Sequence, residues 1–318
     1  MGTQTARQWM VTHEWMVKPM HQTEWIERQG VLVWLAEVFS ALGTGLYLAA
    51  IFVNSWWGAL LGWLIVLLLK LPLHLLYLGK PLRFWRTLPP FSGAWKTSWI
   101  ARGVLFTTVF VAIGLVQLVT SHIITGTTLL TGQALSGLIV LDTAVKVLAG
   151  IFVILTGVYC GFMMSYCKSV PFWNTGLLPI VILNAGIADG LALVMGVGVF
   201  TSGMDFHAIE SAIRITLGIN AVLLATYLLN ATYQSQIAEQ SVRELVIGPL
   251  SIIFWVGIVA CGIIIPLLIS LASLLAGNGS IPLLLGAILC HTIGAFALKY
   301  CLLKVGVHKP IVLRTIIS

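Results

Sequence analysis

Side chains that exchange protons interrupt the first two long apolar runs of this sequence. Lys70, His74 and Tyr77 follow one another at i, i+4 and i+7 in the second run, so a helix places all three on one face. Glu37 lies about two turns into the first run, and Lys70 lies about two turns from the end of the second. If both runs cross a membrane, the two charges lie roughly 9–12 Å below the same surface. We therefore predict a column of exchangeable groups there; a purely structural Glu37–Lys70 pair is the alternative.

Other ionisable residues lie deep in later runs. Asp189 falls in the middle of "NAGIADGLAL", where it serves either a proton path or a local bond to a helix carbonyl. Asp142 and Lys146 are four residues apart, which favours a local helix pair. His74 and His291 are the only histidines well inside the runs, and the five cysteines form no CxxC pair. We expect no haem, no iron–sulfur cluster and no metal in this chain.

The elements that carry these residues are membrane helices. The chain has 318 residues, of which 59% are hydrophobic and 8% charged, with mean hydropathy +1.02. A soluble domain carries roughly 25% charged residues, so the sequence predicts an integral membrane protein. The apolar runs do not alternate, which excludes a β-barrel and predicts an all-α fold with eight transmembrane helices. These helices are expected near 31–53, 57–78, 103–121, 138–165, 176–200, 211–232, 247–273 and 281–303.

We divide the chain into an interfacial arm (1–30), a membrane domain (31–305) and a basic tail (306–318). A four-helix bundle over about 31–165 is expected to carry the site. Trp9, Trp15 and Trp25 make the arm either a membrane anchor or a docking arm.

Lys and Arg gather on one side of the predicted helices. With eight spans both termini share that side, while the loops near 54–56, 122–137, 201–210 and 274–280 carry none. The positive-inside rule places the termini in the cytoplasm, although a basic face also suits an acidic partner. Lipids rather than nucleic acid are expected around the chain. The residues of the basic side are Arg7, Lys18, Arg28, Lys80, Arg83, Arg86, Lys96, Arg102, Lys168, Arg243, Lys304, Lys309 and Arg314.

Three ordered blocks resemble a known family. They are "WLAEVFSALGTGLYL" (34–48), "YLGKPLRFWR" (77–86) followed by "SWIARG" (98–103), and "VYCGFMMS" (158–165) followed by "VPFWNTGLLPIVILNAGIADGLAL" (170–193). Together they are similar to the NrfD / polysulfide reductase membrane-subunit family over about the first two thirds of the chain.

This resemblance implies a quinone-reactive subunit in a prokaryotic cell membrane. It would anchor a four-cluster ferredoxin-like iron–sulfur subunit that is wired to a molybdopterin catalytic subunit, and it would oxidise a menaquinone-type quinol in anaerobic respiration. By motif, Tyr159 matches the tyrosine of the quinone pocket and Arg83 matches the arginine of "LGxPxR". Tyr77 stands where the family often has His, so either Tyr77 or His74 takes that part. Many relatives have exported partners, which would place the basic side outside.

The residue pattern and the family resemblance together predict a quinone site. Two other functions stay open: a secondary transporter that uses Asp189, Arg214 and Glu37, and a membrane anchor that binds haem b. For the quinone ring we expect Tyr159, His74, Tyr77, Glu37 and Arg83. For the proton path we expect Glu37, Lys70 and Asp189. For partner docking we expect Lys80, Arg83, Arg86 and Lys96.

Overall fold

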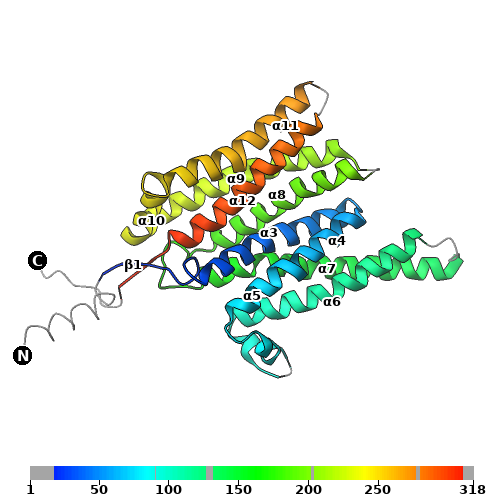
Figure 1. Cartoon of the computed structure of the whole chain (residues 1–318), viewed down its shortest axis with the longest axis horizontal. Coiled ribbons are helices and arrows are strands. Elements are labelled where there is room, and N and C mark those ends of the chain that lie inside the picture. The colour runs from blue at the N-terminus through cyan, green and yellow to red at the C-terminus, as the bar shows by residue number, and fades with distance from the viewer. Residues whose placement is uncertain (1–17, 90, 127–131, 202–203, 277–279, 311–318) are drawn as a thin grey trace, which may run out of the picture.

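The computed structural model describes residues 18–89, 91–126, 132–201, 204–276 and 280–310. Its long helices lie side by side (Figure 1). Eight of them are long and apolar enough to cross a membrane, which confirms the predicted all-α membrane fold. They span Gly30–Phe52, Trp56–Tyr77, Trp99–Thr125, Leu135–Ser165, Leu177–Phe200, Phe206–Gln234, Ile253–Ala276 and Ile281–Lys304.

Two of the eight crossings contain π-helix. The second consists of α4 (Trp56–Ile65), the π-helix η1 (Val66–Lys70) and α5 (Leu71–Tyr77). The seventh consists of the π-helix η4 (Ile253–Ile264) and α11 (Ile265–Ala276). A proline follows each π-helix, Pro72 and Pro266, and it lacks the N–H that an α-helix directs to the carbonyl four residues earlier. Local loss of the α-helical hydrogen bonds therefore accompanies both interruptions.

The remaining crossings are continuous. They are α3 (Gly30–Phe52), α6 (Trp99–Gly126), α7 (Gly132–Ser165), α8 (Leu177–Phe200), α9 (Phe206–Gln234) and α12 (Ile281–Lys304). Helix α3 packs against α4, α7 and α8, and most of its residues are buried. Gly45 and Gly190 allow the close approach of α3 and α8, because a Cβ at either position would overlap backbone of the other helix. The first four crossings are thus joined to the rest through α3 and α8.

Several short elements were not predicted. Helix α10 (Gln236–Val246) is capped by the preceding Ser235, whose hydroxyl accepts a hydrogen bond from the Ala238 N–H. Strands β1 (Met20–His21) and β2 (Val307–His308) form an antiparallel pair between the two ends of the described chain. The 3-10 helices η2 (Pro81–Thr87) and η3 (Ala94–Lys96) lie between α5 and α6. We call the end of the bundle with β1, α10 and η2 the basic end (Figure 1).

The described part of the N-terminal arm packs against the end of α12 and against the segment between α7 and α8. The Gln22 side chain donates a 2.6 Å hydrogen bond to the Leu303 carbonyl, and the Trp25 ring stacks on Trp173 with centroids 5.1 Å apart. Lys304 Nζ lies 2.6 Å from Glu27 Oε1, and this bond lowers the pKa of the Glu27 carboxyl. Residues 1–17, with Trp9 and Trp15, and the tail from 311 to 318 lie outside the described residues.

Candidate functional site

The Tyr159 hydroxyl joins three helices near the basic end. Its oxygen lies 3.0 Å from His74 Nε2 on α5 and 3.3 Å from Glu37 Oε1 on α3, while Tyr159 itself belongs to α7. Glu37 and Tyr159 are each 2% exposed. A hydroxyl has one proton to donate, so Tyr159 either donates to Glu37 Oε1 and accepts from a His74 Nε2–H, or donates to His74 Nε2 and accepts from a protonated Glu37 carboxyl. The three side chains therefore form a path along which protons can shift.

Lys70 completes this group from the end of η1. Its ammonium donates a hydrogen bond to Thr107 Oγ1 on α6 and lies 5.1 Å from the centroid of the Tyr159 ring. Lys70 is 2% exposed. A charged group buried this deeply in a membrane protein needs such partners. Gly103 on α6 gives the Tyr159 ring its space, because a Cβ there would overlap the ring carbons. The hydroxyl is consequently held by packing as well as by hydrogen bonds.

His74 is the outward member of the group. It is half-buried, and α5 has no buried residue, so this short helix faces the surroundings of the bundle. His74 Nδ1 is covered, yet no described residue forms a hydrogen bond with it. A buried polar atom without a partner is costly in an apolar setting, which makes Nδ1 a candidate contact for a polar ligand atom.

The structure leaves two of the expected ring contacts outside this group. Tyr77 lies one turn beyond His74 at the end of α5, without a hydrogen bond to Glu37, His74 or Tyr159. Arg83 lies in η2 and is exposed. Both remain predictions as ligand contacts.

Asp189 lies in a second polar group rather than with Glu37 and Lys70. Its Oδ1 is 3.0 Å from His291 Nε2, and both residues are buried. Sequence reasoning singled out each residue but did not pair them. Their matching depth in the membrane could have paired them. Asp189 is twelve positions after Leu177, and His291 is thirteen positions before Lys304. Both are counted from the basic end of the bundle. Thr107 and Gly103 were also missed; neither residue type stands out in an apolar run.

Comparison with known proteins agrees with the motif blocks. The model of the family described as "Polysulphide reductase, NrfD" matches residues 23–310. The chain belongs to this family. The match extends beyond the blocks to the last three crossings, where sequence reading found no motif.

Three known proteins are similar to parts of this sequence. It is 30% identical over 172 residues to Protein NrfD of Escherichia coli, which covers 52% of this sequence and 52% of the relative. It is 30% identical over 122 residues to the C subunit of polysulfide reductase of Wolinella succinogenes, covering 36% and 38%. It is 25% identical over 173 residues to the NrfD homolog of Haemophilus influenzae, covering 51% and 52%. The matched segments thus span about half of the relatives' length or less.

In this NrfD-family protein the loop after α5 presents cations and aromatic rings together. Lys80, Arg83, Arg86 and Lys96 are all exposed. Arg86 lies 5.4 Å from the centroid of the Trp85 ring, and Lys96 lies 6.0 Å from that of Trp95. Exposed Trp and Arg side chains are frequent anchors of protein interfaces. The predicted docking residues are therefore all exposed within the segment 80–96, which we call the cation–aromatic loop.

Proposed function

We propose that this protein is the membrane subunit of an oxidoreductase complex in which it oxidises quinol for an iron–sulfur partner. Family membership and the likeness to the C subunit of polysulfide reductase support the role as a subunit of such a complex. The observation that carries the quinol assignment is the path from His74 through Tyr159 to Glu37, with His74 Nδ1 left without a partner.

Oxidation of a quinol releases two protons and two electrons. Where His74 Nε2–H donates to the Tyr159 oxygen and Tyr159 donates to Glu37, Nδ1 carries a lone pair and can accept a quinol hydroxyl proton. The first proton bonds to Nδ1 as the Nε2 proton moves to Tyr159 and the Tyr159 proton moves to Glu37. The second hydroxyl proton would follow the same path once Glu37 has released the first and His74 has returned to the starting tautomer, and the two electrons would pass to the iron–sulfur partner. The opposite tautomer places the proton on Nδ1, where it donates to a quinone carbonyl. One histidine thus serves both redox forms of the ligand.

Access and charge fit an apolar ligand with a polar ring. Because α5 has no fully buried residue, a quinol dissolved in the bilayer would approach the half-buried His74 from the side of this helix. The Lys70 ammonium lies beside the Tyr159 ring, where it would offset the negative charge of Glu37 during the proton shift. We assign Glu37 and Lys70 to the proton path, and menaquinone as the quinone.

The cation–aromatic loop lies directly after α5, so a partner docked there comes close to the ring site. Lys80, Arg83, Arg86 and Lys96 suit a partner with an acidic face. We propose a four-cluster ferredoxin-like subunit, which passes electrons to a molybdopterin catalytic subunit. The protein would lie in a prokaryotic cell membrane with the partner at the basic end.

Photolabelling of the intact complex in membranes tests the quinol site. A photoreactive naphthoquinone should label peptides of α3, α5 or α7, and excess unlabelled menaquinone should prevent it. His74→Leu should reduce the label at least about ten-fold, because it removes the proposed ring contact. Labelling that competes with menaquinone but falls on α11 and α12 would overturn the assignment.

A further inference from the structure

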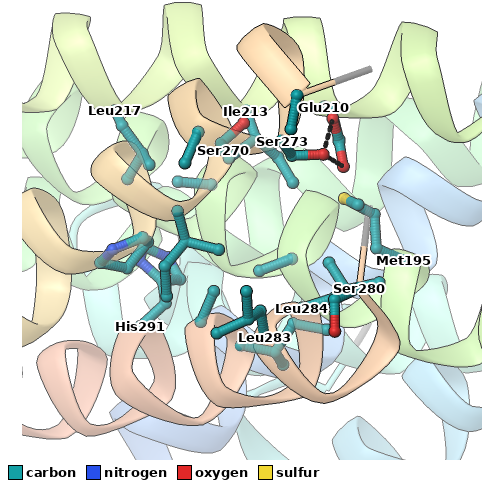
Figure 2. Close-up of a pocket in the computed structure, with 18 residues that line it drawn as sticks. Met195, Glu210, Ile213, Leu217, Ser270, Ser273, Ser280, Leu283, Leu284 and His291 are labelled. Carbon is teal, nitrogen blue, oxygen red and sulfur yellow. Dashed lines mark hydrogen bonds between the residues drawn. The ribbon is translucent and has the colours of Figure 1, made fainter. Parts of the chain in front are cut away.

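A cavity of about 170 Å³ lies between α8, α9, α11 and α12, away from the quinol site. Figure 2 shows His291 at one end of it and Glu210, Ser273 and Ser280 at the other. Ser280 immediately precedes α12, and His291 follows it in the third turn, so the cavity extends roughly 15 Å along this helix. A volume of about 170 Å³ spread over that length is narrow, which suits a chain better than a ring.

Small side chains leave this space open. A Cβ at Gly294 on α12 would overlap Gly262 on η4, so these two crossings nearly touch at the inner end of the cavity. Toward the opposite end of the bundle, alanines from three helices line a space that larger residues would fill. They are Ala188, Ala192, Ala272, Ala276 and Ala287.

The wall of the cavity favours an apolar occupant. Between the two polar ends it is formed by side chains such as Ile213, Leu217 and Leu284, which offer water no hydrogen bonds. An apolar cavity of roughly 150 Å³ stays dry and binds a small hydrocarbon. Left empty, such a cavity forfeits dispersion contacts around its whole lining, so a hydrocarbon inside it stabilises the fold.

The cavity opens between α11 and α12. Most residues of α11 are partly or fully exposed, and Leu283 on α12 lines the cavity although it is 57% exposed. The inner end is closed instead, where Ala188 and Leu217 are 1% and 0% exposed. The other exposed residues at the opening are Ala272, Ala276 and Ser280. In a bilayer, the opening therefore faces lipid and the closed end lies near the midplane.

The outer end of the cavity carries a net negative charge. Glu210 lies there, with the Ser273 hydroxyl 3.4 Å from its Oε1 and Arg214 3.6 Å from its Oε2. Arg214 is one turn deeper on α9 and also donates a 3.0 Å hydrogen bond to the Ser270 hydroxyl. Asp205 caps α9 at the same end and is exposed, and the segments 201–210 and 274–280 contain no Lys or Arg. Two carboxylates beside one guanidinium suit an ammonium headgroup better than an anionic one.

We propose that the cavity binds one acyl chain of a phospholipid with an ammonium headgroup, such as phosphatidylethanolamine, from the leaflet at the opposite end. The chain enters between α11 and α12 and lies along Ile213, Leu217 and Leu284, while the ammonium faces Asp205 and Glu210. One leaflet holds about half of the ~30 Å of hydrocarbon, which matches the extent of the cavity. This lipid site lies in the second half of the protein and does not depend on the quinol site near Tyr159.

Photolabelling with a synthetic lipid tests the site in the full-length protein. Phosphatidylethanolamine with a diazirine at the end of one acyl chain is reconstituted with the protein and irradiated, and mass spectrometry maps the labelled residues. Label should appear on Ala188 or Leu217, because these buried residues meet a lipid chain only inside the cavity. Phe110 is the matched control: it is 0% exposed, does not line this cavity and should stay unlabelled.

Two variants separate the cavity from the outer lipid. Ala287→Phe places a ring in the cavity and should reduce the label at the closed end at least about ten-fold, because a packed interior has no second space for the chain. Leu289→Phe places the same ring on the outer face of α12, where Leu289 is 64% exposed, and should leave the label unchanged. Both variants are compared at equal Tm in detergent.

The headgroup is tested with the unchanged protein. Phosphatidylglycerol with the same photoreactive chain should give several-fold less label at Ala188 and Leu217, because its charge is repelled by Asp205 and Glu210. Absence of label at the closed end, equal labelling by the two lipids, or loss of the label with excess menaquinone would overturn the proposal. Neither of the first two results would bear on quinone labelling at α5, so the two proposals fail separately.

Discussion

Replacing Tyr159 with Phe removes one oxygen from the bundle and leaves the ring in place. The ring still fills the space beside Gly103 and still lies under the Lys70 ammonium. Only the contacts of 3.0 Å to His74 and 3.3 Å to Glu37 are lost. The Tyr159→Phe subunit should therefore fold and assemble, while the proposed relay from His74 to Glu37 is broken.

The expected loss follows from these two hydrogen bonds. A buried hydrogen bond contributes about 0.5–1.5 kcal/mol, and a buried group left unsatisfied costs about 1–3 kcal/mol. If about 1.4–2.8 kcal/mol of this is lost in the transition state for quinol oxidation, the rate falls roughly 10- to 100-fold. The lower limit applies if a water replaces the hydroxyl and restores the relay.

The assay compares two reactions of the same purified complex. Quinol oxidation should fall in Tyr159→Phe, whereas electron transfer from an artificial donor directly to the partner's clusters should persist. Tyr227→Phe is the matched control, because Tyr227 is also fully buried and its hydroxyl donates a 2.7 Å bond to the Phe172 carbonyl, away from His74. Unchanged quinol turnover in Tyr159→Phe, or an equal loss in Tyr227→Phe, would refute the relay.

Three further predictions concern docking, packing and orientation. Arg83→Glu should release the partner without lowering the thermal stability of the subunit, since the side chain is exposed. Lys168→Glu, on another loop of the basic end, is the control and should leave the partner bound. Full assembly of the Arg83→Glu variant would contradict docking at this loop. Gly190→Ala should destabilise the fold by about 1–3 kcal/mol through overlap with Gly45, measured as a lower Tm in detergent. The control Gly218→Ala has open space for a Cβ and should keep the Tm of the unchanged protein. Equal Tm values for the two variants would refute the close approach of the helices. A protease-sensitive tag on the C-terminus should stay protected in intact cells if the positive-inside rule holds, and cleavage from outside would place the basic end there.

Much of the candidate site was predictable because depth in a membrane can be counted along a sequence. Glu37, Lys70 and Tyr159 lie at similar distances from the basic ends of their helices, and His74 is one turn from Lys70. Whether these side chains touch depends on which helices are neighbours and on how each helix is rotated about its axis. Hydrophobic periodicity did not predict either, because the runs are apolar on all sides. Asp189 illustrates the limit: its depth suited several partners, and only the packing of α8 beside α12 selected His291.

The sequence alone determined the membrane class, the eight crossings and the basic end. Each of these depends on a local property, either a run of apolar residues or a count of charges in a loop. Tertiary structure decided which helices touch, and with them the partners of Glu37, Tyr159, Asp189 and His291 on other helices. It also decided the partner of the Gly262 carbonyl in η4, which the missing N–H of Pro266 leaves free and which the His291 side chain of α12 contacts at 2.8 Å. Partners so far apart along the sequence, such as Gly262 and His291, are brought together only by folding.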